Sequence, residues 1–238
     1  MLPDRLRTVL VAVDFSEAAG EAVALGGLLA SAGSAALVAL HAEPRDLPPY
    51  FTVQQIASFE RAHQEAHREA EAFLRAFVAA RTAWDADVRI REERPAEAIL
   101  QAAVDADLVL MGTHGRRGPS RWWMGSVAER VVRGCDRPVL VVPERGVAAA
   151  PLEVFSRVLL IGSEGQATGP ALSWVARLIE PLGGTVIDGG EARTCDVAAF
   201  RSASMVAAVL PPAVETPRVP DLGVLLRECQ RPALFVRT

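Results

Sequence analysis

The chain has 238 residues, of which 50% are hydrophobic and 5% aromatic, and this length suffices for one large domain or two small ones that each bury a core. Its 25 Lys and Arg residues and 29 Asp and Glu residues give a net charge of −4, which argues against a dedicated nucleic-acid-binding protein. No apolar run approaches the roughly 20 residues that span a bilayer, and residues 1–5 contain no signal-peptide pattern. We therefore expect a cytoplasmic location and no membrane insertion.

Apolar runs and helical periodicity alternate through the first 143 residues. Unbroken Val- and Leu-rich runs are typical of parallel strands covered on both faces, and their alternation with helices predicts a doubly wound α/β fold. Ser16 is a suitable N-cap, Gly33 a suitable helix end, and Pro95 suits a first helical turn. The predicted strands are 8–13, 36–41, 87–91, 108–111 and 138–142, and the predicted helices are 17–32, 53–81, 95–104 and 126–134.

A glycine-rich loop between a predicted strand and a predicted helix gives the strongest indication of function. Gly112 and Gly115 are followed, after nine residues, by Gly125 and Ser126. Glycines allow backbone N–H groups to come close to a phosphate, and a helix N-terminus supplies free donors and partial positive charge. The segment therefore predicts a phosphate-binding loop, with a long loop of tight turns and a helix cap as the plainer alternative.

Residues 144–153 are rich in Ala, Gly and Pro, and we expect them to link two domains, 1–146 and 151–238. Beyond this segment two motifs return in the same order, which indicates an internal duplication. Arg157–Gly162 resembles Thr8–Val13, and Cys229–Val236 resembles Cys135–Val142. The motifs return 149 and 94 positions later, so the second copy is about 55 residues shorter. It lacks a counterpart of helix 53–81, and we expect a smaller sheet that depends on the first half for burial.

The loop, the strand-end residue Asp14 and the duplication together resemble the universal stress protein family. Val11-Ala12-Val13-Asp14-Phe15-Ser16 resembles the first strand and turn of that family, and Arg137-Pro138-Val139-Leu140-Val141-Val142 resembles its last strand. The resemblance covers residues 1–145 well and 151–238 in outline. It implies two tandem Rossmann-like domains with doubly wound parallel sheets, the second smaller, and an ATP-binding protein of stress response or signalling.

The resemblance also implies a role for individual residues. Asp14 is expected to face the ribose and the adenine, the backbone of His41 and Ala42 to hold the adenine, and Met111 with Gly112 to line the ribose. The remaining residues would surround the phosphates. The implied site for ATP, with or without Mg²⁺, consists of Val13, Asp14, His41, Ala42, Met111, Gly112, His114, Gly115, Arg116, Arg117, Gly125, Ser126 and Val127.

The second half departs from this pattern. The predicted strand 205–210 runs into Pro211-Pro212 where the first half has its glycine loop, and proline has no N–H to offer a phosphate. The position that matches Asp14 falls at or near Ser163. We therefore expect one nucleotide site per chain, in the N-terminal domain.

Plainer roles remain open for several residues. Asp14 could merely cap the first helix, and His114 could shape the loop or face solvent. His63 and His67 share a helix face but do not form the His-Glu-x-x-His pattern of zinc proteases, so we expect a solvated face. Trp122-Trp123-Met124 is expected to pack the loop on its own domain or on a partner chain.

The three cysteines, Cys135, Cys195 and Cys229, form no Cys-x-x-Cys pair. This spacing supports neither a zinc site nor a redox motif. We expect free, buried or half-buried thiols in a reducing compartment.

Three functions remain in competition, because fold alone cannot decide among them. The first is a binding protein that acts through nucleotide occupancy; no P-loop lysine is available for phosphoryl chemistry. The second is a slow ATPase, in which Asp14 and Ser126 share a Mg²⁺ and His114 orients water. The third is a partner or scaffold protein that binds no nucleotide.

The resemblance further implies an assembly through last strands. Family members often dimerise through the strand that matches 138–142, and strand 233–236 could supply that contact internally as a pseudo-dimer. A homodimer and an unidentified protein partner are further expectations.

Overall fold

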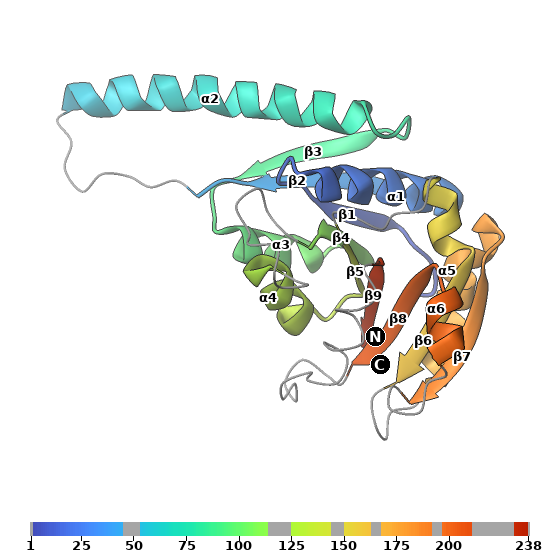
Figure 1. The fold of residues 1–238 in the computed structure, drawn as a ribbon. Helices are drawn as coiled ribbons and strands as arrows, with labels where there is room; N and C mark the ends of the chain where they lie inside the picture. The colour runs from blue at the N-terminus through green and yellow to red at the C-terminus, as the bar shows by residue number, and fades with distance from the viewer. Residues whose placement is uncertain are drawn as a thin grey trace.

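The computed structural model of the chain describes residues 2–44, 53–113, 125–143, 150–162, 168–191, 197–210 and 231–237. They form one nine-stranded sheet with helices on both faces (Figure 1). The strands are β1 (Thr8–Ala12), β2 (Ala36–Ala42), β3 (Ala86–Arg91), β4 (Leu108–Gly112), β5 (Val139–Val142), β6 (Arg157–Gly162), β7 (Thr185–Glu191), β8 (Met205–Leu210) and β9 (Ala233–Arg237). The α-helices are α1 (Glu17–Gly33), α2 (Val53–Ala79), α3 (Pro95–Ala103), α4 (Ser126–Gly134), α5 (Gly169–Ile179) and α6 (Val197–Ser202).

Local signals explain where the first helix begins and ends. Ser16 is the N-cap of α1, and its Oγ accepts a hydrogen bond from the Ala19 amide at 3.1 Å, as predicted. The residue that leaves the helix in the left-handed region is Ser34, with φ 52°, and not Gly33. In the N-terminal half, the observed bounds of every predicted element lie within two residues of the prediction.

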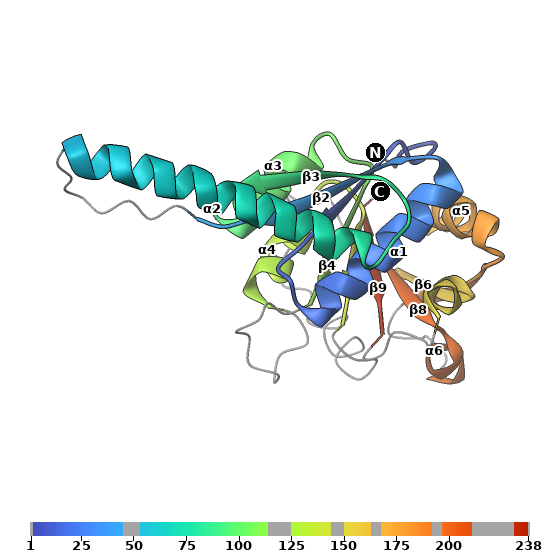
Figure 2. The same cartoon turned by 90° about the horizontal axis from the view of Figure 1, so that it is seen from above.

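Two apolar layers cover the two faces of the sheet, because strand residues alternate between them. One layer contains Val9 and Val11 of β1 together with the buried faces of α1, α2 and α5. The other contains Leu10 of β1 together with α3, α4 and Ala203, which follows α6. Figure 2, seen from above, shows α1 and α5 on the same side of the sheet. Both layers include strand residues from both halves of the chain, so the halves share their cores.

The two halves join through antiparallel pairing of β5 with β9, in which Leu140 lies opposite Leu234. The sheet order is β3-β2-β1-β4-β5-β9-β8-β6-β7, and the other paired strands run parallel. The two predicted parallel sheets therefore merge into one mixed sheet. The internal contact between strands 138–142 and 233–236 is present, and it directs the end of β9 toward the start of β5.

The second half repeats the strand order of the first with one strand fewer. The order β2-β1-β4-β5 corresponds to β7-β6-β8-β9, and within the described residues β3 has no counterpart. Arg137 and Arg231 precede β5 and β9 at matching positions, and each donates to a carbonyl at a helix end. Arg137 reaches the Val104 carbonyl after α3, and Arg231 reaches the Phe200 carbonyl in α6. These likenesses support the proposed duplication.

The segment predicted as a linker is structured at its end. Residues 151–155 form a 3-10 helix, η1 (Pro151–Phe155), in which Val154 and Phe155 are fully buried. Both side chains belong to the apolar layer that contains α1. The predicted linker 144–153 thus ends in the first turn of this 3-10 helix with residues 151–153 exposed, and the buried side chains begin just beyond it at Val154.

The long helix α2 extends past the β3 edge of the sheet, as both ribbon views show (Figures 1 and 2). Its C-terminal part packs through Leu74 and Val78, which are buried. Many of its other described side chains are exposed, among them several charged ones, and Glu71 pairs with Arg75 at 2.8 Å. The charges of this helix therefore form its solvated face, as expected.

Candidate functional site

The carboxyl ends of β1, β2 and β4 meet at one edge of the sheet. Ala12 of β1 lies opposite Leu40 of β2 and opposite Met111 of β4. The strand order turns back between β1 and β4, and in open α/β sheets ligands bind in the crevice at such a switch point. The predicted residues that lie at this edge are Val13, Asp14, His41, Ala42, Met111 and Gly112.

Asp14 follows β1 and fixes the start of α1. Its Oδ1 accepts hydrogen bonds from the Ser16 amide at 3.0 Å and from the Ser16 hydroxyl at 2.6 Å. The residue that caps the helix is Ser16 and not Asp14, and Asp14 supports this cap by binding Ser16. Because a carboxylate has two oxygens and about four acceptor positions, this role leaves Asp14 able to accept from a ligand hydroxyl as well.

An aromatic group lies beside the ends of β1 and β2. His41 links the two strands, since its Nδ1–H donates to the Val13 carbonyl at 2.7 Å and a carbonyl can only accept. The Phe15 ring centroid lies 4.5 Å from that of His41 and 4.8 Å from that of Phe73 on α2. Phe15 has φ 63°, a conformation that is uncommon for residues other than glycine. No local sequence pattern predicted this aromatic group.

Gly112 allows the end of β4 to approach the start of α1 closely. A Cβ at this position would lie 3.0 Å from the Ala18 Cβ and 3.3 Å from the Ala19 amide nitrogen. The next residue, Thr113, is buried, and its amide donates to the Val142 carbonyl of β5 at 2.8 Å. A side chain at position 112 would push these elements apart.

The start of α4 is tied to the end of β4. Gly125, the N-cap of α4, donates its amide hydrogen to the Thr113 carbonyl at 2.6 Å. Glycine has no side chain that could accept from the first-turn amides, which lack intrahelical partners in any α-helix. Ser126 is exposed and Val127 half-buried. This end of the helix therefore presents backbone donors beside the crevice.

The structure thus brings together nine of the predicted site residues around two helix starts and three strand ends. Four others, His114, Gly115, Arg116 and Arg117, lie outside the described residues, and so does Trp122-Trp123-Met124. Of the cysteines, Cys135 is buried and free, and Cys195 and Cys229 fall outside the described ranges. Burial raises the pKa of the Cys135 thiol, which keeps it protonated and unreactive.

The opposite end of α4 is held by a residue that sequence reasoning missed. Arg237, the last residue of β9, is buried and donates to three carbonyl oxygens. Its Nη2 reaches the Val132 carbonyl at 2.8 Å and the Arg133 carbonyl at 2.9 Å, and its Nε reaches the Cys135 carbonyl at 3.0 Å. The C-terminal half therefore contacts the helix whose first turn is tied to the end of β4.

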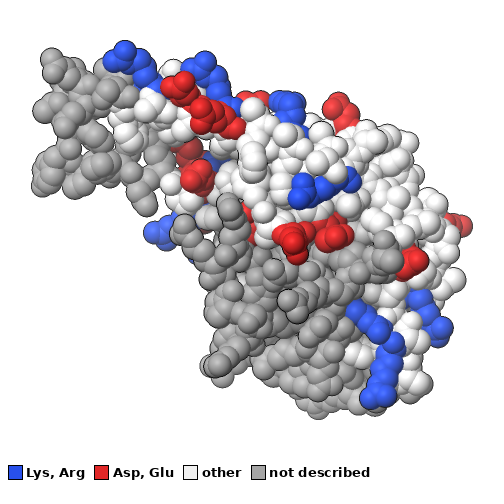
Figure 3. Space-filling view, turned by 45° about the horizontal axis from the view of Figure 1, so that its top comes forward, with Lys and Arg blue, Asp and Glu red and all other residues white. Residues whose placement is uncertain are grey.

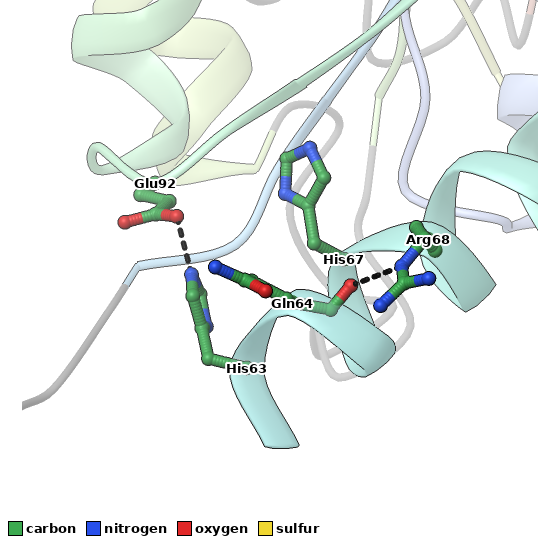
Figure 4. A pocket seen from close by; sticks show the side chains of 5 residues that line it. All are labelled: His63, Gln64, His67, Arg68 and Glu92. Atoms are coloured by element: carbon green, nitrogen blue, oxygen red, sulfur yellow. Dashed lines mark hydrogen bonds and ion pairs between the residues drawn. The ribbon is translucent and has the colours of Figure 1, made fainter. Parts of the chain in front are cut away.

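A hollow lies between α2 and the end of β3 (Figure 4). It is lined by His63, Gln64, His67, Arg68 and Glu92. The His63 Nε2 lies 2.6 Å from a Glu92 carboxylate oxygen, so His63 has a partner where only solvent was expected. Within the described ranges no three His, Cys, Asp or Glu side chains are grouped to hold a metal ion.

Charge is mixed on the surface of the protein. On the face seen in Figure 3, acidic and basic side chains are interspersed. All 25 basic residues are arginine. Among the described helices, none combines the length and apolar character needed to cross a membrane.

Comparisons with known proteins converge on one family. The model of the family described as "Universal stress protein family" matches residues 5–143. A universal stress protein of Thermus aquaticus is 36% identical over 139 residues, which are 57% of this chain and 98% of that protein. The structure of a universal stress protein from Archaeoglobus fulgidus covers 98% of this chain and 97% of its own, with 16% identity and a TM-score of 0.58. That of a universal stress protein in complex with cAMP covers 60% of this chain and 100% of its own, with 26% identity and a TM-score of 0.43.

Proposed function

The chain belongs to the universal stress protein family, and on that premise we propose that its N-terminal half binds an adenine nucleotide, ATP, in the crevice between β1 and β4. One nucleotide is bound per chain. Its presence or absence is the signal that the protein conveys in a stress response. Because the family match covers residues 5–143, the proposal concerns that half.

One observation carries this proposal: the Gly125 amide donates to the Thr113 carbonyl at 2.6 Å and thereby ties the first turn of α4 to the end of β4. Backbone amides at a helix start are donors with partial positive charge and suit an anionic phosphate. The glycine cap leaves this turn without a competing side-chain acceptor of its own. Ser126 and Val127 are the described residues that would meet the phosphates, together with Gly115, Arg116 and Arg117 of the loop.

The nucleoside would lie toward β1 and β2. Asp14 is half-buried at the end of β1, and its carboxylate suits the ribose hydroxyls, which donate hydrogen bonds. The backbone at His41 and Ala42 would meet the adenine, with Met111 and Gly112 beside the ribose. The ring group of Phe15 and His41 holds the backbone on this side in place.

We propose binding without phosphoryl chemistry as the main activity. The chain contains no lysine. No lysine can therefore reach the β- and γ-phosphates, as one does in P-loop proteins. The second half is proposed to bind no nucleotide at the corresponding edge, since Pro211 and Pro212 follow β8 in the sequence and proline has no N–H.

Calorimetric titration of ATP into the full chain tests the proposal, with Asp14→Ala and Ser16→Ala as a matched pair. Both substitutions remove a hydrogen bond that supports the α1 cap, but only the first removes the proposed ribose contact. We expect the wild type and Ser16→Ala to bind one ATP per chain, and Asp14→Ala to bind at least about tenfold more weakly, a difference of about 1.4 kcal/mol.

Absence of heat from well-folded wild type, or equal loss in both variants, would contradict this assignment. Release of phosphate that stops in Asp14→Ala would instead favour the slow ATPase. Mass analysis of nucleotide released from the denatured protein identifies the ligand that the site retains.

A further inference from the structure

Arg237 is an unusual residue for its position, a buried arginine in the central part of the sheet with only 6% of its surface exposed. It follows Phe235 by two positions, so its side chain points to the same face of the sheet as Phe235, the face covered by α3 and α4. The antiparallel pairing of β5 with β9 brings it beside the segment that joins α4 to β5.

At that place the guanidinium satisfies carbonyl groups that a helix end leaves without partners. The Val131 carbonyl accepts from the Cys135 amide at 2.8 Å, while the Val132, Arg133 and Cys135 carbonyls accept from Arg237. Cys135 itself is extended, with φ −88° and ψ 128°, so the usual left-handed cap is absent here. A side chain from the other half of the chain performs that task.

The helix α4 is short enough for its two ends to move together. The helix has nine residues and is therefore only about 14 Å long. A helix of this length does not form by itself in water, so tertiary contacts decide its position. A shift at the Arg237 end moves the first turn beside Gly125 as well.

The positive charge of Arg237 also stabilises the C-terminal end of α4. A cation at a helix C-terminus complements the helix dipole, and Arg237 lies where water does not screen it well. Burial lowers the pKa of the Arg237 guanidinium, but arginine remains charged at physiological pH.

We propose that Arg237 of the C-terminal half is a positioning residue for the phosphate site of the N-terminal half, acting through α4. The inference rests on the proposed nucleotide function and adds a role for the shortened half. That half does not bind nucleotide but holds the helix that does. Contacts of the adenosine part with β1 and β2 do not involve α4 and are independent of Arg237.

The test compares ATP with adenosine on the full chain. In Arg237→Met, which keeps the length of the side chain without its donors, we expect ATP affinity to fall about tenfold and adenosine affinity to stay unchanged. Arg231→Met is the matched control, since Arg231 is also a carbonyl-capping arginine of the C-terminal half but holds α6. It should leave both affinities unchanged. A parallel loss for ATP and adenosine, or an equal effect of Arg231→Met, would overturn the proposal.

Two further measurements keep the test decisive. If Arg237→Met does not fold, Arg237→Lys replaces the planar fork by a single ammonium. In this variant ATP affinity should fall a few-fold and adenosine affinity should stay unchanged. An ATP affinity equal to that of the wild type would count against the role.

Hydrogen exchange of the α4 amides, relative to those of α3, should become faster in Arg237→Met. If the wild type binds no nucleotide, the proposed function fails. Hydrogen exchange of the α4 amides then still decides whether Arg237 holds α4. If the exchange rates do not change in Arg237→Met, Arg237 does not position this helix.

Discussion

The two halves of this chain keep the same strand order but differ at the carboxyl edge of the sheet, where the nucleotide site is proposed. In the N-terminal half, Asp14 follows β1 and a glycine-capped helix follows β4. In the C-terminal half, Ser163 follows β6 closely and Pro211 follows β8 in the sequence. Buried strands persist in both halves: β8 is buried along its whole length, as β5 is. The comparison shows that the same order of buried strands is compatible with different residues at the carboxyl edge of the sheet.

The same comparison shows what the second half still contributes. Its strands complete both apolar layers, and β9 covers the β5 edge. Arg231 repeats the capping role of Arg137, and Ser204 binds the Arg157 amide where Asp107 binds the Arg7 amide. These contacts stabilise the sheet and its helices, so we regard the second half as a structural support for the first.

The largest effect should come from separating the halves at residue 146. Residues 147–238 by themselves would expose the β9 edge and both unfinished layers, and we expect no cooperative thermal transition. Residues 1–146 should fold but expose the apolar edge of β5, and exposed edges pair with other chains. Calorimetry and sedimentation of the two fragments check this. If the C-terminal fragment is monomeric and melts cooperatively, the second half does not depend on the first for burial.

A smaller but still severe loss is expected at the junction of the halves. Phe155→Ala removes a fully buried ring from the shared layer, and such truncations cost about 3–5 kcal/mol. Leu152→Ala is the control within the same 3-10 helix, because Leu152 is 48% exposed, and it should change stability by under about 0.5 kcal/mol. Urea unfolding measures both. Equal effects would mean that η1 does not couple the halves.

The matching arginines allow a direct comparison at intermediate size. Arg231 donates to the carbonyls of Phe200, Ala203 and Arg201, whereas Arg137 has one such bond, to Val104. Arg231→Met should therefore cost about 2 kcal/mol and Arg137→Met about 1 kcal/mol of unfolding free energy. A larger loss for the Arg137 variant would show that the two caps are not equivalent.

The smallest effect concerns α2, which has no counterpart in the second half among the described residues. Glu71→Gln breaks the exposed pair with Arg75, and pairs of this kind contribute about 0.3–0.5 kcal/mol. We expect a change within that range, reduced further at 1 M salt. A loss above about 1 kcal/mol would indicate that this helix face is not merely solvated.

Much of the fold could be predicted because the central strands are unbroken apolar runs, as in β1, β4 and β8. The edge strand β7 escaped prediction because Asp188, Gly189 and Gly190 interrupt its apolar pattern. Helix α6 escaped because it has only six residues. Short and edge elements depend on their neighbours, which a local pattern does not contain.

Some residues of the candidate site can likewise be predicted from the sequence and others cannot. Asp14, Gly112 and Gly125 stand out in the sequence because turns, close approaches and caps restrict residue type. Phe15 and Arg237 do not, since their partners are distant in the sequence. An arginine that ends a strand could equally point into solvent, and only the pairing of β5 with β9 decides its role.

The strand contact between β5 and β9 has a final consequence for behaviour on dilution. Two separate subunits joined along such an edge come apart as their concentration falls. Here the partner strand is covalently attached, so its local concentration is fixed by the chain itself. The support that β9 gives to α4 is therefore equally available whether the cell holds many copies of the protein or few.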